Sequence, residues 1–187
     1  MRVKEITKKE IEDRFLEMSD YMKIEYLSSC LKNQIDFDTR KFVLVKLSGL
    51  YETKGMFLDA AKAMKSAAEI NTTKRGKVND FVKAAELFVR GGDFDMVDIV
   101  VKKSFALTEW AEAWEVEEKI KSFYRIQGKV STERNKRKQA IGIYEKLLGM
   151  SKDEEKEWVE GKLLELYEGV GEMNKFRSLK RRAYGSN

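Results

Sequence analysis

Residues 44–67 read LVKLSGLYETKGMFLDAAKAMKSA. Large apolar residues recur three and four positions apart, which is the period of an α-helix, both before Gly55 (Leu47 and Tyr51) and after it. Glycine tolerates the left-handed backbone conformation that ends many helices. The segment therefore predicts two helices that meet at Gly55 and fold back on each other as an antiparallel hairpin.

Small residues lie among the large ones in this segment. Ser48, Ala60 and Ala67 are small enough to let two helices approach closely. Tyr51 and Met64 are large enough to fill the space that remains between neighbouring helices. We expect this alternation of sizes to form the contact between the two helices of the hairpin.

Glycines recur along the chain at Gly55, Gly92, Gly128 and Gly171, at intervals of 37, 36 and 43 residues. Regular intervals of this length are typical of helical-repeat proteins. No segment alternates apolar and polar residues for long enough to predict a strand. The ten predicted helices span residues 8–18, 20–33, 39–54, 56–70, 77–90, 94–106, 108–126, 133–149, 152–170 and 173–184.

The residues around these glycines resemble the tetratricopeptide repeat, in which W-x₂-L-G-x₂-Y is followed by A-x₃-F. In the first copy, Leu44, Ser48 and Met64 stand at the positions of the Trp, the Gly and the Phe. A third copy is interrupted by a polar insertion at 129–138. The resemblance covers residues 39–184. The related helical array of the soluble adaptor proteins of vesicle fusion is the alternative family.

The repeats predict an all-α fold, and the resemblance implies a right-handed α-solenoid of about five antiparallel helical hairpins. We expect one TPR-like domain over residues 1–187. Its predicted hairpins are approximately 8–33, 39–70, 77–106, 108–149 and 152–184. The first hairpin, 8–33, lacks the glycine found at the turn of the other hairpins. As the terminal hairpin it has a helix face without a neighbour, which is a candidate homo-oligomer interface.

The composition argues against catalysis. The 187 residues include no histidine, which removes the commonest general base and metal ligand. The only cysteine, Cys30, cannot form an internal disulfide or a thiolate zinc site. We therefore predict a chain that is not an enzyme and binds no cofactor or metal. A single thiol and the lack of an apolar run of about 18 residues predict a cytoplasmic protein without a membrane span.

The resemblance implies a groove lined by the first helix of each hairpin, which would hold a partner peptide or helix. Relatives that grip a carboxylate use a Lys/Asn cluster, whereas Val45 and Val82 occupy those places here. A mixed apolar and charged groove suits an amphipathic partner helix. The predicted groove residues are Phe42, Val45, Glu52, Asn79, Val82, Glu86, Val89, Arg90, Glu118, Ser122 and Arg125.

Nucleic-acid binding is the alternative function. The formal charge is +5, and basic residues concentrate in 119–138 and 174–182. Such residues would release counterions from phosphates. The residues predicted for this contact are Lys129, Arg134, Lys136, Arg137, Lys138, Arg177, Lys180, Arg181 and Arg182.

Aromatic residues are expected mainly in the core. Trp110 and Trp114 lie four apart in a segment rich in glutamate, and Trp158 begins another helix. Trp110 and Trp114 are a candidate interface hot spot, but because large aromatic side chains usually supply core area, we predict that all three are packed. Cys30 lies on an apolar stripe and is predicted to be a buried structural thiol.

Overall fold

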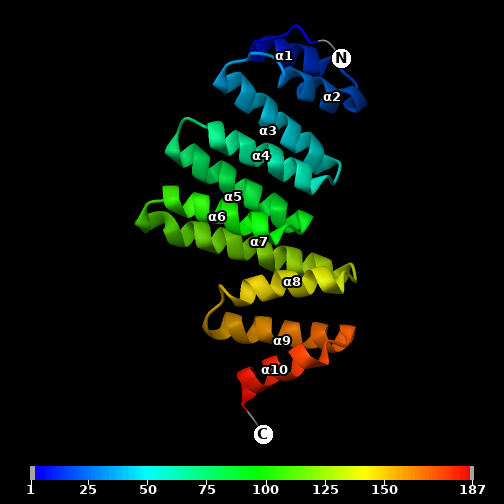
Figure 1. The fold of residues 1–187 in the computed structure, drawn as a ribbon, viewed down its shortest axis with the longest axis vertical. Helices are drawn as coiled ribbons and strands as arrows, with labels where there is room; N and C mark the ends of the chain where they lie inside the picture. Colours follow the sequence, from blue (N-terminus) through cyan, green and yellow to red (C-terminus); the bar gives the residue numbers. More distant parts are fainter. Residues whose placement is uncertain (1–2, 186–187) are drawn as a thin grey trace. The chain divides into compact units, whose positions relative to one another are not determined.

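The computed structural model describes residues 3–185, except for the side chains of Asp20 and Tyr184. Residues 1, 2, 186 and 187, at the two ends of the predicted domain, lie outside the described residues. The described chain is helical and contains no strand (Figure 1). Its elements are α1 (Lys8–Leu16), α2 (Asp20–Cys30), α3 (Phe37–Thr53), α4 (Phe57–Ile70), α5 (Lys74–Gly91), α6 (Phe94–Leu107), the 3-10 helix η1 (Trp110–Glu112), α7 (Ala113–Glu133), α8 (Arg137–Leu148), α9 (Asp153–Val170) and α10 (Met173–Tyr184). The predicted all-α array of helical hairpins is confirmed.

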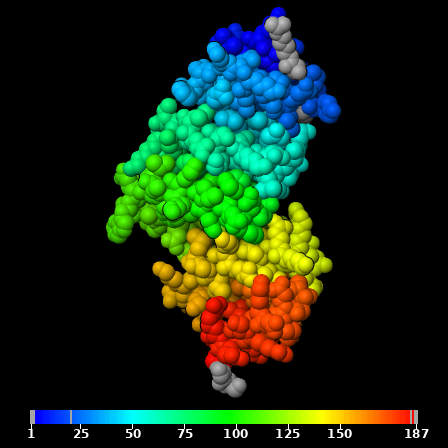
Figure 2. Space-filling view, viewed as in Figure 1, coloured from blue at the N-terminus to red at the C-terminus, as the bar shows by residue number. Residues whose placement is uncertain are grey.

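The chain divides into two compact units, the first ending at Val116 and the second beginning at Glu117. In the first unit, α4 packs against both α3 and α5, and α5 packs against α6. Figure 2 shows one face of this unit as a continuous surface from blue to green. In the second unit, α9 packs against both α8 and α10.

Three glycines close the first helix of their hairpins as predicted. Gly55, Gly92 and Gly171 have positive φ angles of 74°, 81° and 77°. In each turn the next N–H reaches back five residues, for example from Asp93 to the Phe88 carbonyl at 3.1 Å. This hydrogen bond defines the Schellman motif and satisfies a carbonyl at the end of the helix.

The predicted turn at Gly128 is wrong. Helix α7 continues through this residue to Glu133, and the left-handed residue of that turn is Asn135, with φ 56°. Asparagine is the residue that most often replaces glycine in this conformation. The N–H of Lys136 then donates to the Ser131 carbonyl at 2.8 Å, as in the glycine turns. Residues 129–138 are therefore the end of α7, a turn and the start of α8, not an insertion.

Gly128 has a packing role instead. A Cβ at Gly128 would lie 2.8 Å from the ring of Tyr144, which is almost fully buried. Counted back from the left-handed residue of each turn, Gly128 occupies the place of Ser48 and Ala85, which are also buried. The Ser48 hydroxyl donates to the Ala60 carbonyl at 2.9 Å. Three of the four hairpins therefore have a small, buried residue at this position, and the fourth has Leu164.

The core of the first unit is rich in alanine. Ala60, Ala67, Ala84 and Ala85 are fully buried, which confirms that small residues mediate the close helix contacts. Larger side chains complete the layers between helices, and Phe88 and Leu87 are also without solvent exposure.

The prediction for Cys30 is confirmed, whereas the prediction for the tryptophans is wrong. Cys30 is fully buried among the residues of α1, α2 and α3. Trp110 is 94% exposed, Trp114 65% and Trp158 44%. Helical spacing shows that such residues share a face but does not show what covers that face. Within residues 3–185, no helix combines the length and the apolar character needed to cross a bilayer.

We expect Gly128→Ala to lower the free energy of unfolding by about 1–3 kcal/mol, because the added methyl group would overlap the Tyr144 ring. The matched control is Gly161→Ala in α9, where the added Cβ meets open space. That substitution should raise stability by about 0.5–1 kcal/mol through helix propensity. Urea unfolding of both variants measures the difference, and equal stabilisation would refute the packing role of Gly128.

Candidate functional site

The predicted groove residues of the first unit lie on α3 and α5, but not all of them reach the surface. Val89 is fully buried and Val82 nearly so, because α5 packs against α4 and α6. The prediction that Val89 contacts a partner is therefore wrong, because no partner atom can reach its side chain. Val82 keeps a small exposed fraction of 9%. Val45 is 38% exposed and Asn79 is exposed, so both remain accessible.

Phe42 lies at the contact between α3 and α1. The Lys8 ammonium group is 5.1 Å from the centre of its ring, and the Lys46 ammonium group is 5.4 Å from it. Phe42 is partly buried against the core that α1, α2 and α3 share. Its ring is therefore half covered by groups of the chain itself.

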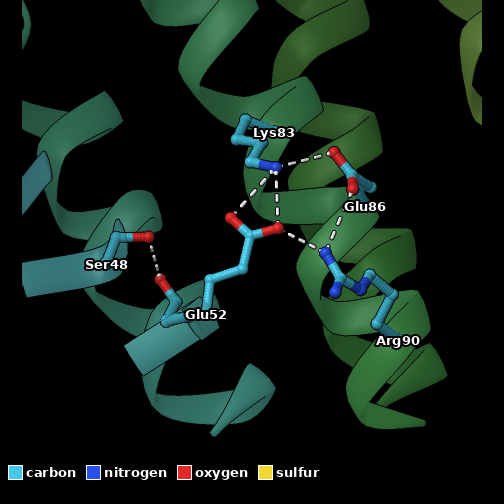
Figure 3. A network of polar contacts seen from close by, with 6 residues as sticks. Ser48, Glu52, Lys83, Glu86 and Arg90 are labelled. Atoms are coloured by element: carbon cyan, nitrogen blue, oxygen red, sulfur yellow. Dashed lines mark hydrogen bonds and ion pairs between the residues drawn. The ribbon is translucent and has the colours of Figure 1, made fainter. Parts of the chain in front are cut away.

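The charged groove residues of the first unit form one ionic network (Figure 3). The Glu52 carboxylate on α3 accepts hydrogen bonds from Lys83 and Arg90 on α5. The Lys83 ammonium group also lies 3.0 Å from Glu86, and the Arg90 guanidinium lies 3.5 Å from the same carboxylate. The network joins α3 to α5, so these charges compensate one another within the protein.

The surroundings of Glu52 favour its ionised form. Partial burial alone raises the pKa of the carboxyl group, but the hydrogen bonds and charges of Lys83 and Arg90 outweigh burial and lower the pKa below its ordinary value of 4.5. The Arg90 guanidinium also stacks 4.1 Å from the centre of the Phe57 ring. The network is therefore held on two sides, by an anion and by an aromatic face.

The second unit has an apolar pocket on the equivalent helices, α7 and α9. The cavity has a volume of ≈ 510 Å³. Ile126 is 59% exposed at this site, and the rings of Trp158 and Tyr144 meet edge to face, with centres 5.8 Å apart. The residues that line the pocket are Arg125, Ile126, Lys129, Thr132, Glu133, Tyr144, Trp158 and Lys162.

The charged groups at the pocket rim are paired. Arg125 donates to Glu118 at 2.7 Å and also to Glu155 on α9. Lys162 lies 3.0 Å from Glu165. Burial alone would lower the pKa of Arg125, but its hydrogen bonds to the two glutamates raise it. The rim is thus held in place by ion pairs around an apolar centre.

Two of the sequence-predicted site residues line this pocket, Arg125 from the groove prediction and Lys129 from the nucleic-acid prediction. Glu118 lies beside it through its ion pair with Arg125. The predicted groove residue Ser122 is half-buried on α7 and does not line the cavity. The structure brings none of the first-unit groove residues into the lining of this pocket.

Thr132 and Glu133 were missed because the third repeat was aligned on Gly128, and Trp158 and Lys162 because no groove residue was predicted in the last hairpin. When positions are counted back from the left-handed residue of each turn, Arg125 and Thr132 correspond to Val45 and Glu52. The turn residue is Asn135 for the first pair and Gly55 for the second. Counted from Gly171, Trp158 takes the place of Phe42. The asparagine between Arg134 and Lys136 is the sequence signal that corrects the alignment.

The residues predicted for nucleic-acid contact are spread over α7, the turn that follows it, α8 and α10. Arg137 is held by the chain itself, since its guanidinium donates to the Gly169 carbonyl at 2.6 Å and to the Asn135 side chain. Lys129 is 4.0 Å from Glu133. The other seven are exposed: Arg134, Lys136, Lys138, Arg177, Lys180, Arg181 and Arg182.

The sequence matches no protein-family model and no curated protein. Among solved structures, BtubC (BKLC) from P. vanneervenii is 16% identical, with 92% of this chain and 75% of that chain aligned and a TM-score of 0.40. The MamA protein is 17% identical, with 96% of this chain and 98% of that chain aligned and a TM-score of 0.42. Similarity at this level says nothing about function.

We expect Glu52→Gln to lower the free energy of unfolding by about 1 kcal/mol at pH 7, because it leaves Lys83 and Arg90 without their shared anion. The folded pKa of Glu52 is lowered, so its contribution is complete above the unfolded pKa of about 4.5 and is lost as the pH falls through the folded value. The difference in stability between wild type and variant should therefore shrink as the pH falls below the unfolded pKa.

Chemical unfolding between pH 3 and pH 7 measures this difference. The control is Glu165→Gln, which removes only an exposed pair with Lys162 and should change stability by less than about 0.5 kcal/mol. A difference between wild type and Glu52→Gln that stays constant down to pH 3 would contradict the role of the charged carboxylate.

Proposed function

We propose that this chain is a non-catalytic protein-binding module, and that the α7–α9 pocket receives an apolar side chain from a partner peptide or amphipathic helix. The observation that carries the proposal is the exposed apolar surface of Ile126 and Trp158 around a cavity of ≈ 510 Å³. A concave site with an apolar centre and a few polar groups at its edge is typical of binding sites.

The chemistry of the lining favours a protein partner. Tryptophan residues at the centre of a pocket dominate the binding energy of many protein interfaces. A partner side chain that fills the pocket would remove the exposed faces of Ile126 and Trp158 from water, which is favourable by about 25 cal/mol per Å² of apolar surface. The paired charges around this centre would form the polar rim that such interfaces have.

The accessible groove residues of the first unit form a second, separate candidate contact. Val45 presents an apolar side chain, and Asn79 presents an amide that can hydrogen-bond to a peptide backbone. Glu52, Glu86 and Arg90 contribute their ionic network as a fixed pattern of charge, which would select the register of a partner.

The test uses the whole chain of residues 1–187 as bait in cell lysate of its source, with and without nuclease, followed by mass spectrometry. We expect wild type to retain a protein partner and Ile126→Glu to lose it, because the substitution puts a charge into the apolar pocket. Ile126 is largely exposed, so the variant should fold normally.

The matched control is Ile99→Glu on α6, since Ile99 is 46% exposed and lies outside the pocket. It should retain the partner. Loss of the partner in both variants, or equal retention in both, would contradict the pocket assignment. Binding that disappears with nuclease in wild type would instead support the nucleic-acid alternative.

A further inference from the structure

A tryptophan surface in the first unit has no role in the proposed function. The 3-10 helix η1 and the first turn of α7 present Trp110 and Trp114, which are 94% and 65% exposed. Exposed apolar surface of this kind marks interaction sites. Glu109, Glu112 and Glu115 lie beside the two tryptophans and are also exposed. We call these five residues the acidic tryptophan patch.

The carboxylates of this patch are largely uncompensated. Glu112 and Glu115 form no ion pair with any residue in the described part of the chain. Glu109 has a single contact with Lys74, at 3.8 Å between two well-exposed side chains. Such a surface combines indole faces, which attract cations, with free anions.

The chain carries the complementary surface on α10. Arg177, Lys180 and Arg181 are exposed, lie three and four residues apart along the helix, and have no carboxylate partner among the described residues. We call these three residues the basic strip. The opposite side of α10 is occupied by its own packing, since Leu179 is buried and α10 packs against α9.

We propose that the acidic tryptophan patch of one molecule binds the basic strip of a second copy of this chain. Arginine side chains would stack on the exposed indoles and pair with the neighbouring carboxylates, which are the two contacts that a guanidinium makes best. Charge complementarity favours a second copy as the occupant, since both halves of the contact are exposed on every molecule.

The contact is heterologous, because the two surfaces are different parts of the chain. Each complex of two molecules therefore still has one free patch and one free strip, and assembly continues head to tail with rising concentration. The contact does not use the α7–α9 pocket, so it is independent of the proposed function, and Ile126→Glu should self-associate like wild type.

Sedimentation velocity of the full-length chain tests the proposal. We expect the average mass to rise with concentration at 50 mM salt and to return towards the monomer at 500 mM salt, since ions screen exposed charge pairs. Trp110→Ala/Trp114→Ala should weaken association at least about tenfold. Both tryptophans are exposed, so the thermal midpoint should stay within about 2 °C of wild type.

A mixing experiment identifies the occupant. Trp110→Ala/Trp114→Ala keeps only the basic strip, and Arg177→Glu/Arg181→Glu keeps only the patch, so each variant alone should be monomeric. An equimolar mixture should form a dimer that does not grow, because only one pair of complementary surfaces remains. The control Lys136→Glu/Lys138→Glu has the same change in charge outside the strip and should associate like wild type.

Three results would overturn the proposal. These are a wild-type chain that stays monomeric up to millimolar concentration at 50 mM salt, a mixture of the two variants that stays monomeric, and loss of association in the Lys136→Glu/Lys138→Glu control. The last result would show that total charge, and not the basic strip, drives self-association.

Discussion

Four hairpins turn at a single residue in the left-handed backbone conformation, namely Gly55, Gly92, Asn135 and Gly171, and the position of that residue sets the register of the two helices that it joins. The N–H group that follows it bonds to a carbonyl five residues earlier, as from Met56 to Tyr51 and from Glu172 to Tyr167. This bond ends one helix and aims the chain back along it. Every side chain that the hairpin brings together depends on where this residue lies.

Close approach of the two helices is the second requirement, and in three of the four turns a small residue lies seven positions before the turn residue. Ser48, Ala85 and Gly128 lie at this position and are buried, whereas Leu164 holds it before Gly171 and is half-buried. At Gly128 no larger side chain fits, since the methyl group of an alanine would overlap Tyr144. The neighbour decides how small the residue must be, because Tyr144 supplies a full aromatic ring.

The same helix face has different chemistry in the two units. In the first unit, Glu52 and Arg90 join α3 to α5, and the charges there are satisfied within the chain. In the second unit, Arg125 and Glu155 join α7 to α9, but Ile126 and Trp158 remain exposed beside this pair. Ion pairs join the helices in both units, and in the second unit an apolar cavity lies beside the pair.

Helical periodicity was sufficient to predict the helices and their pairing, because a continuous apolar stripe must be buried against a neighbour. Three of the four turns were predicted from glycine alone, because glycine adopts the left-handed conformation without a steric penalty. Gly128 could not be interpreted locally, since glycine serves equally as a left-handed residue and as the absence of a side chain, and only its contact with Tyr144 distinguishes the two. The burial of Val89 and the exposure of Trp110 likewise depend on which helices lie alongside, and that information is present only in the folded chain.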